Sequence, residues 1–321
     1  MCGTHDYILF ATDKGRVYRL KGYEVPEATR TARGMNIINL IQLPQDEKIT
    51  TILPLPKEVP EATRTARGMN IINLIQLPQD EKITTILPIP KEVPENLNLV
   101  MVTKGGIIKR TELSAYNNVR KSGLIAISLD EGDSLAWARI TNGSDELIVA
   151  TRDGVAIRFD ENDVRLVGRS ARGVKAIELR EGDEVVGMGV CSEGDELLTI
   201  TEDGKGRRSL TEEYRLQTRG GKGVRNYETE KYGKVCGVRI VSKDLDAILI
   251  SHSGIIIRTH IEDIALQSRY AGGVKVMRLG EEDKVVTFAA TLRDDEEETE
   301  MPEAEAVNDA ETAEIPAESE E

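Results

Sequence analysis

The residues of this chain that could do chemistry are arginines and lysines in short polar loops that end in glycine. Four of these loops end at Gly123, Gly173, Gly223 and Gly273, one every 50 residues. Guanidinium and ammonium groups neutralise phosphate, and cations at a regular spacing favour contact with a phosphate backbone. The candidate contacts are Arg30, Arg33, Arg64, Arg67, Arg120, Lys121, Arg169, Arg172, Arg219, Lys222 and Arg269.

The sequence offers little for catalysis. Its three histidines and three cysteines stand in no pattern typical of a nucleophile with its base, a metal site or a disulfide framework. We therefore predict no catalytic residue, no metal site and no cofactor in this chain. The sequence also shows neither the features of a signal peptide nor an apolar stretch long enough to span a membrane. We therefore expect a cytoplasmic protein without a membrane partner.

The elements that must position the cations are short strands. The pattern Thr/Ser-x-x-Gly-x-x-x-Arg begins at Thr12, Thr103, Thr151, Thr201 and Ser251. An apolar run too short for a helix precedes each turn glycine, and dipeptides such as Asp153-Gly154 favour a two-residue hairpin turn. A second alternating stretch, such as residues 174–179, follows each loop glycine. Four short strands per 50 residues predict an all-β, propeller-like array of about five four-stranded blades, which would align the basic loops along one outer rim.

Net charge separates the chain into two parts. The chain has 42 basic and 56 acidic residues, and 14 of the acidic ones lie in residues 294–321, which contain no Lys or Arg. Residues 1–293, the predicted DNA-binding domain, are therefore neutral overall. The acidic segment has few large apolar side chains, so we expect residues 294–321 to form a disordered tail.

One loop resembles a known motif. Gln217-Thr-Arg219-Gly220-Gly221-Lys222-Gly223 is similar to the box of the DNA gyrase A subunit, with one departure at Thr218. Together with the repeats it makes residues 4–290 resemble the C-terminal domain of that subunit. The resemblance implies a β-pinwheel, usually of six blades, whose blades exchange strands. It also adds Gln217, Gly220, Gly221 and Gly223 to the DNA-binding residues, since backbone N–H groups in a glycine loop can bind an anion.

The function that the resemblance implies is DNA wrapping. The domain would bind, bend and wrap duplex DNA without reading its sequence, and would support ATP-dependent negative supercoiling by the complete type IIA topoisomerase. The chain alone would not be an enzyme. Its partners would be double-stranded DNA and the remainder of gyrase, meaning the rest of the A subunit together with the B subunit, and the holoenzyme would use ATP and magnesium. The C-terminal domain of topoisomerase IV and a propeller that docks a protein partner remain alternatives, and a propeller hydrolase is the third class.

Two features depart from the family pattern. The box lies in the fourth of five full repeats, whereas in the family it lies in the first blade, so we expect that first blade to be missing here. Residues 24–61 also recur as residues 58–95, with Leu55 and Ile89 the only difference. The duplication 24–57/58–91 leaves one copy without a hairpin of its own, and we expect that copy to lie outside the ring.

Overall fold

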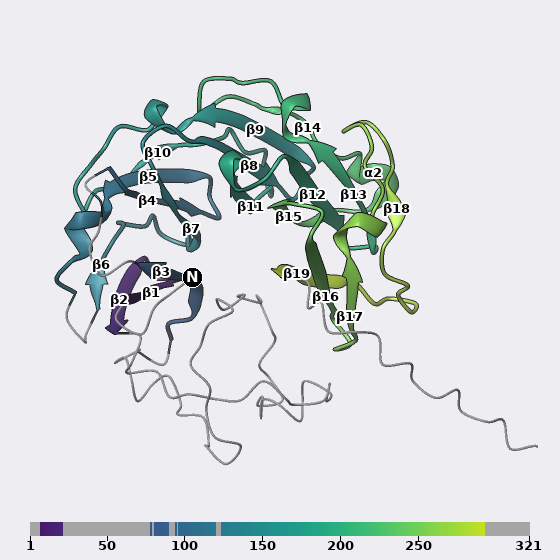
Figure 1. The fold of residues 1–321 in the computed structure, drawn as a ribbon, viewed down its shortest axis with the longest axis horizontal. Helices are drawn as coiled ribbons and strands as arrows, with labels where there is room; N and C mark the ends of the chain where they lie inside the picture. Colours follow the sequence, from purple (N-terminus) through teal and green to yellow (C-terminus); the bar gives the residue numbers. More distant parts are fainter. Residues whose placement is uncertain are drawn as a thin grey trace, which may run out of the picture.

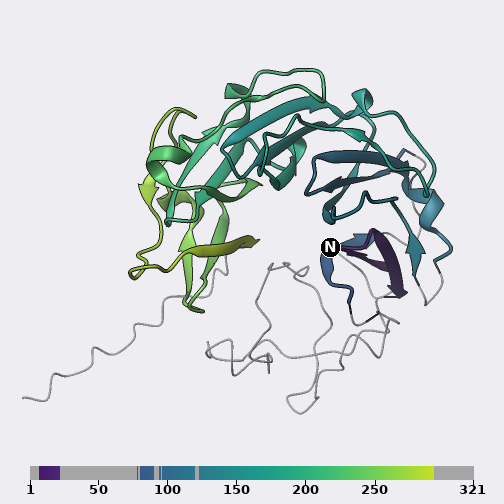
Figure 2. The ribbon, with the colours of Figure 1, turned by 180° about the vertical axis from the view of Figure 1, so that it is seen from behind.

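The computed structural model describes residues 7–21, 78, 80–89, 94, 96–119 and 123–292. The described strands form five small antiparallel sheets, arranged as an arc of blades around a common centre (Figure 1). The reverse view shows the same order of blades along the arc (Figure 2). The predicted all-β, propeller-like fold is therefore confirmed.

Four blades have four strands, and the fifth has three in the described part of the chain. Their strands, in spatial order, are β3(Ile83–Ile89)-β1(Tyr7–Thr12)-β2(Arg16–Lys21)-β6(Leu124–Ile125), β10(Val174–Lys175)-β5(Ile107–Glu112)-β4(Asn98–Thr103)-β7(Leu135–Thr141), β11(Val185–Val190)-β8(Glu146–Thr151)-β9(Val155–Asp160)-β14(Val224–Arg225), β15(Val235–Val241)-β12(Glu196–Thr201)-β13(Lys205–Leu210)-β18(Val274–Lys275), and β17(Ile256–His260)-β16(Leu245–Ser251)-β19(Val285–Leu292).

In the part of the chain that the structure describes, helical structure is confined to short turns. These are the 3₁₀ segments η3(Leu113–Tyr116), η4(Glu161–Asp163), η5(Cys191–Glu193), η6(Thr211–Glu213) and η7(Ile261–Asp263) and one α-helical turn, α2(Thr229–Tyr232). None of the helices in the described residues is long and apolar enough to cross a membrane.

The blades exchange strands. Strand β10 follows β9 in the chain, yet it pairs with β5 of the preceding blade, and β14 and β18 likewise pair with β9 and β13. The stretch expected to be one alternating strand at residues 174–179 is therefore a two-residue strand that leaves its own blade. We call β6, β10, β14 and β18 the exchanged strands, and Figure 1 places them on the outer side of the arc.

Each exchanged strand begins directly after a loop glycine because the backbones come very close there. A Cβ on Gly173 would lie 2.5 Å from the carbonyl oxygen of Ile108, and Gly223 meets Ala156 in the same way at 2.6 Å. Both glycines also have positive φ, +102° and +68°. Only glycine accommodates this combination without strain.

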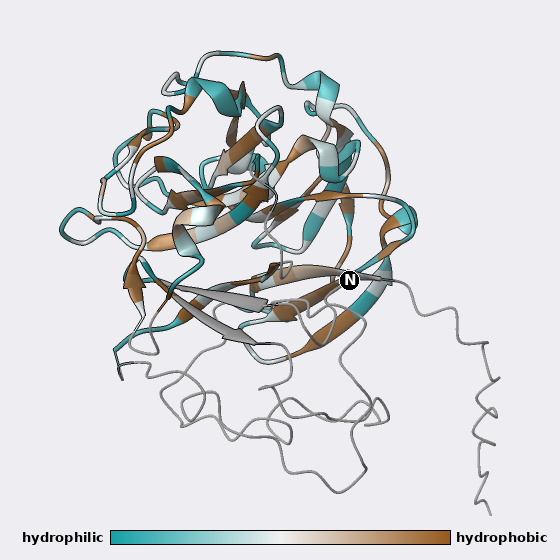
Figure 3. Ribbon diagram, turned by 60° about the vertical axis from the view of Figure 1, so that its left-hand side comes forward, coloured by the Kyte–Doolittle hydropathy of each residue, from teal (hydrophilic) through white to brown (hydrophobic). Residues whose placement is uncertain are grey.

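The core lies between neighbouring blades. Successive residues of β4 point to opposite neighbours: Leu99 and Met101 pack toward the first blade, while Val100 and Val102 pack toward the third. This is the period-2 alternation of a strand with both faces buried, which explains the continuous apolar runs in the sequence. Figure 3 shows the apolar residues concentrated on the strands and the hydrophilic ones on turns and loops.

The hairpin turns are longer than expected. Between β8 and β9 three residues remain unpaired, and the N–H of Gly154 donates to the carbonyl of Thr151 at 3.0 Å. Gly154 has φ +79°, so it supplies the left-handed residue of a three-residue loop. The two-residue turn predicted from Asp153-Gly154 was wrong in length, although the conformational reason for glycine holds.

The second copy of the duplicated segment supplies a strand of the first blade. Strand β3 comes from this copy and pairs with β1, with Leu9 opposite Leu87. The corresponding residues of the first copy, 49–55, lie outside the described residues, as do residues 294–321.

Candidate nucleic-acid interface

The outermost strand of every four-stranded blade exposes its second residue. These residues are Ile125, Lys175, Arg225 and Lys275, in β6, β10, β14 and β18. In register, Lys175 lies opposite Ile107 and Arg225 opposite Val155. Three successive blades therefore present a cation at the same structural position. Among the described residues none of these three cations forms an ion pair.

Lys175, Arg225 and Lys275 are not among the contacts predicted from the sequence. The sequence does contain a pattern that could identify them as a set, because each cation follows a loop glycine by two positions and the three recur every 50 residues. The alternating pattern around each of them predicts a longer strand inside its own blade, as at residues 174–179. Strand exchange moves them to the outer edge, and pairing with the preceding blade is a property that local sequence does not reveal.

Of the two predicted loop arginines before Gly173, one is neutralised within the protein. Arg172 forms a bidentate pair with Asp130, with Nε 2.5 Å from Oδ1. The pair lowers the pKa of Asp130 and raises that of Arg172, chiefly through their hydrogen bond. Arg169 is exposed and donates to the carbonyl of Ala115 at 3.3 Å. Arg169 is therefore the freer of the two charges for a phosphate.

The box arginine lies across the exchanged strand. Arg219 Nη1 donates to the carbonyl of Lys175 at 3.1 Å, and its Nε donates to the carbonyl of Asp163 at 2.8 Å. Arg269 repeats this contact, donating to the carbonyl of Arg225 at 2.7 Å. These guanidinium groups are held by neutral acceptors, so their positive charge is not cancelled at the surface.

The other box residues divide between structure and surface. Gln217 is half-buried, and its Nε2 has no hydrogen-bond partner among the described atoms. Gly220, with φ +78°, donates to the carbonyl of Ala176 at 2.6 Å, and Gly221 accepts from the backbone N–H of Glu178 at 2.9 Å. Gly223 packs on β9, as described above. Lys222 is exposed and completes the set of predicted box residues.

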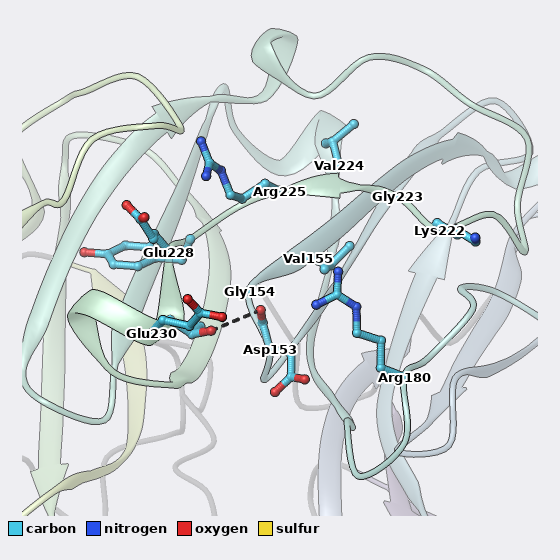
Figure 4. A pocket seen from close by; sticks show the side chains of 12 residues that line it. Asp153, Gly154, Val155, Arg180, Lys222, Gly223, Val224, Arg225, Glu228 and Glu230 are labelled. Atoms are coloured by element: carbon cyan, nitrogen blue, oxygen red, sulfur yellow. Dashed lines mark hydrogen bonds between the residues drawn. The ribbon is translucent and has the colours of Figure 1, made fainter.

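Lys222 borders a pocket of about 360 Å³ between the box loop and the Asp153-Gly154 turn. Figure 4 shows Arg180 and Lys222 on one side of its lining and Glu228 and Glu230 on the other, with the Arg225 side chain directed to the same side as Glu228 and with Asp153 between the two sides. Thr229 Oγ1 donates to the carbonyl of Asp153 at 3.4 Å and joins α2 to the turn. The mixed charges favour a solvated groove at the edge of a cationic surface.

The four hairpin-closing arginines whose side chains the structure describes form ion pairs within the protein. Within blades, Arg158 pairs with Glu146 at 2.6 Å, Arg208 with Glu196 at 2.6 Å and Arg258 with Asp246 at 2.7 Å. Arg110 instead reaches Glu161 of the next repeat at 3.3 Å. A carboxylate within the protein therefore compensates the charge of each of these four arginines, which favours a structural role over a phosphate contact.

Six of the predicted contacts cannot be placed. Arg30, Arg33, Arg64, Arg67, Arg120 and Lys121 lie outside the described residues. The described candidates, Arg169, Arg172, Arg219, Lys222 and Arg269, all belong to loops that run along the exchanged strands.

Strand exchange and the outer cations define a class of protein, a β-pinwheel with a basic rim. A family model described as the DNA gyrase C-terminal domain, β-propeller, matches residues 6–56, 57–90, 97–142, 145–192, 195–242 and 246–291. The chain belongs to this family. The first two of the six matched segments together span residues 6–90, which include the duplicated region, and the described residues of that span contribute to one blade of the five that the described strands form.

Individual relatives agree with the family. The DNA gyrase A subunit of Halalkalibacterium halodurans is 46% identical over 172 residues, which cover 54% of this chain and 16% of that protein. The corresponding protein of Clostridium acetobutylicum is 43% identical over the same length, with the same coverage of each chain. The chain thus spans about 16% of the curated relatives that it matches.

Solved structures include both kinds of topoisomerase domain. A DNA gyrase A C-terminal domain superimposes with TM-score 0.67 at 26% identity, covering 90% of this chain and 84% of that one. A DNA topoisomerase IV C-terminal domain superimposes with TM-score 0.72 at 25% identity, covering 90% and 80%.

Proposed function

We propose that this chain binds duplex DNA along its outer rim, without reading the base sequence, and bends the duplex around the arc of blades. The observation that carries the proposal is the recurrence, on the exchanged strands of three successive blades, of an exposed cation that has no ion pair among the described residues. Lys175, Arg225 and Lys275 have the same place in each blade, so a phosphate backbone that follows the rim meets a positive charge at each step.

The loop cations extend this surface. Arg169, Arg219 and Arg269 occupy equivalent positions, and the last two lie across the exchanged strands. No recognition helix is present in the described residues, and the cations can contact phosphate but offer no regular set of groups for base edges. These features support binding that depends on charge and shape.

Within the cell, the proposed role is the DNA-wrapping part of gyrase. The rest of the gyrase A subunit together with the gyrase B subunit would supply DNA cleavage and ATP hydrolysis with magnesium, in the bacterial cytoplasm at the nucleoid. The box Gln217–Gly223 and the sequence relatives favour gyrase. The solved topoisomerase IV domain keeps that enzyme as the second candidate.

The test uses the chain with a random-sequence linear duplex and with a relaxed circular plasmid. We expect a gel shift that weakens steeply with salt. We also expect a change in plasmid linking number when a relaxing topoisomerase is added to the bound plasmid, because wrapped DNA constrains supercoils. Binding without a linking-number change would refute wrapping. No binding at low salt would refute the DNA-binding proposal and favour the alternative of a propeller that docks a protein partner.

A further inference from the structure

Two blades contain a fully buried cation directly before the hairpin arginine. Lys109 on β5 and Arg207 on β13 occupy equivalent positions and are both 0% exposed. The third and fifth blades have Ile157 and Ile257 there. Burying a cation is costly unless its hydrogen bonds are well made. Among the described residues neither cation has a carboxylate partner, so other groups must compensate its charge.

The compensating groups are backbone carbonyls at two equivalent positions in the two blades. Lys109 Nζ donates to Ala126, the residue after exchanged strand β6, and to Arg169 in the basic loop. Arg207 Nη2 donates to Asn226, the residue after exchanged strand β14, and at 2.7 Å to Arg269 in the basic loop. Each buried cation therefore ties one basic loop to the end of a neighbouring exchanged strand.

Arg207 adds further contacts of the same kind. Its Nε donates to the carbonyl of Ser268 at 3.1 Å, and its guanidinium lies 4.4 Å from the ring centre of Tyr227. The carbonyls of residues 268 and 269 thus both point inward, onto the buried cation. A peptide plane fixed in this way also fixes where the Arg269 side chain leaves the backbone.

The box loop achieves the same link without a buried cation. Ile157 lies beneath it, and the carbonyl of Ala176, which is equivalent to those of Ala126 and Asn226, accepts from the N–H of Gly220 at 2.6 Å. Gly220 reaches this acceptor with φ +78°, a conformation that Ser170 and Tyr270, at the same place in the other loops, do not adopt. The glycine amide therefore replaces the cation.

We propose that Lys109 and Arg207 are positioning residues that hold the basic loops 164–173 and 264–273 in their DNA-binding conformation, and that the Gly220 amide holds the box loop. The inference rests on the proposed function for its DNA readout. Its structural part, that these donors fix their loops, stands independently. Desolvation lowers the pKa of Lys109 to about 8, which agrees with a cation held only by neutral acceptors.

The test compares Lys109→Met and Lys109→Arg, with Ile157→Met in the neighbouring blade as control. Limited trypsin digestion followed by mass spectrometry reports the rate of cleavage after Arg169. We expect Lys109→Met to raise that rate roughly tenfold through local opening, with cleavage after Lys222 unchanged. Lys109→Arg should restore protection, because Arg207 shows that a guanidinium fits this position. Ile157→Met should behave as wild type.

DNA affinity is measured on the same variants by fluorescence anisotropy. We expect Lys109→Met to weaken binding roughly threefold to tenfold at low salt, and Lys109→Arg to recover it. A folded Lys109→Met protein with wild-type cleavage and wild-type affinity would overturn the inference, as would a Lys109→Arg protein that behaves like the Met variant. Altered cleavage in a chain whose wild type does not bind DNA would refute the proposed function but leave the loop assignment supported.

A second variant covers the case in which Lys109→Met does not fold. Gly220→Ala changes a half-buried surface loop and should remove the Ala176 contact alone. Trypsin should then cut faster after Lys222 but not after Arg169, and adding Ile157→Lys should restore protection by supplying the buried cation. Unchanged cleavage in Gly220→Ala would overturn the inference for the box loop.

Discussion

Neutralising the three cations of the exchanged strands is the sharpest test of the rim. In the variant Lys175→Gln, Arg225→Gln, Lys275→Gln the side chains stay polar and exposed, and no described ion pair is lost. Each phosphate neutralised contributes about 0.9 to the slope of log affinity against log salt, so loss of three contacts should flatten the slope by about 2.7. Between 50 and 200 mM salt this corresponds to roughly a 40-fold smaller loss of affinity.

The assay is fluorescence anisotropy of a labelled random-sequence duplex over a salt series. The matched control is Lys104→Gln, Lys234→Gln, Lys284→Gln, which removes the same total charge from cations paired with Glu184, Asp153 and Glu202. We expect this control to change the slope by well under one. Equal flattening in both variants would show that net charge alone sets the slope, and an unchanged slope in the rim variant would refute the assignment of the rim.

Four further predictions follow from the fold and the sequence. Burial lowers the pKa of Lys109 in the folded protein to about 8, below the usual 10.5. Between these two pH values the unfolded chain binds more protons than the folded one, so the free energy of unfolding should rise with pH. Urea titrations from pH 8 to 10.5 should show the wild type gaining up to about 3 kcal/mol of unfolding free energy relative to Lys109→Met. Gly223→Ala should lower stability by about 1–3 kcal/mol, because its φ is +68° and the added Cβ would meet the Ala156 carbonyl; calorimetry that gives an unchanged melting temperature would contradict this. Deleting residues 24–57 should preserve or raise the melting temperature, since β3 comes from the second copy, and an unfolded deletion product would show that both copies are structural. Truncation after Arg293 should tighten DNA binding about tenfold at low salt and much less at high salt, because it removes 14 acidic residues that compete with phosphate for the cations. Equal affinities of the truncated and the full chain at low salt would show that the acidic residues do not compete for the DNA-binding surface.

Local pattern was sufficient to predict the strands but not their partners. The apolar runs before each turn glycine identified β1, β4, β8, β12 and β16, because a short run bounded by turn residues has few alternatives to a strand. The local pattern by itself predicts residues 174–179 as a strand of their own blade, whereas the strand exchange implied by the family resemblance is the arrangement that the structure shows. A stretch of two residues carries no signal for the sheet that it joins, and its pairing depends on where the preceding loop ends.

The candidate site shows the same division. The 50-residue spacing of the basic loops was enough to predict that Arg169, Arg219 and Arg269 share one structural position, and all three lie in equivalent loops. Sequence could not separate Arg169 from Arg172. The difference between them is the Asp130 partner, which lies 42 residues away in the chain and is brought near only by the packing of neighbouring repeats.

The sequence by itself determined the repeat, its length and the glycine that ends each loop, because turn chemistry and period-2 burial are local consequences of residue type. The tertiary structure decided which charges reach the surface. Strand exchange carries Lys175, Arg225 and Lys275 outward, and blade packing buries Lys109 and Arg207 beneath the loops. A cation's role here depends on the neighbours that long-range pairing gives it, and a linear pattern does not contain those neighbours.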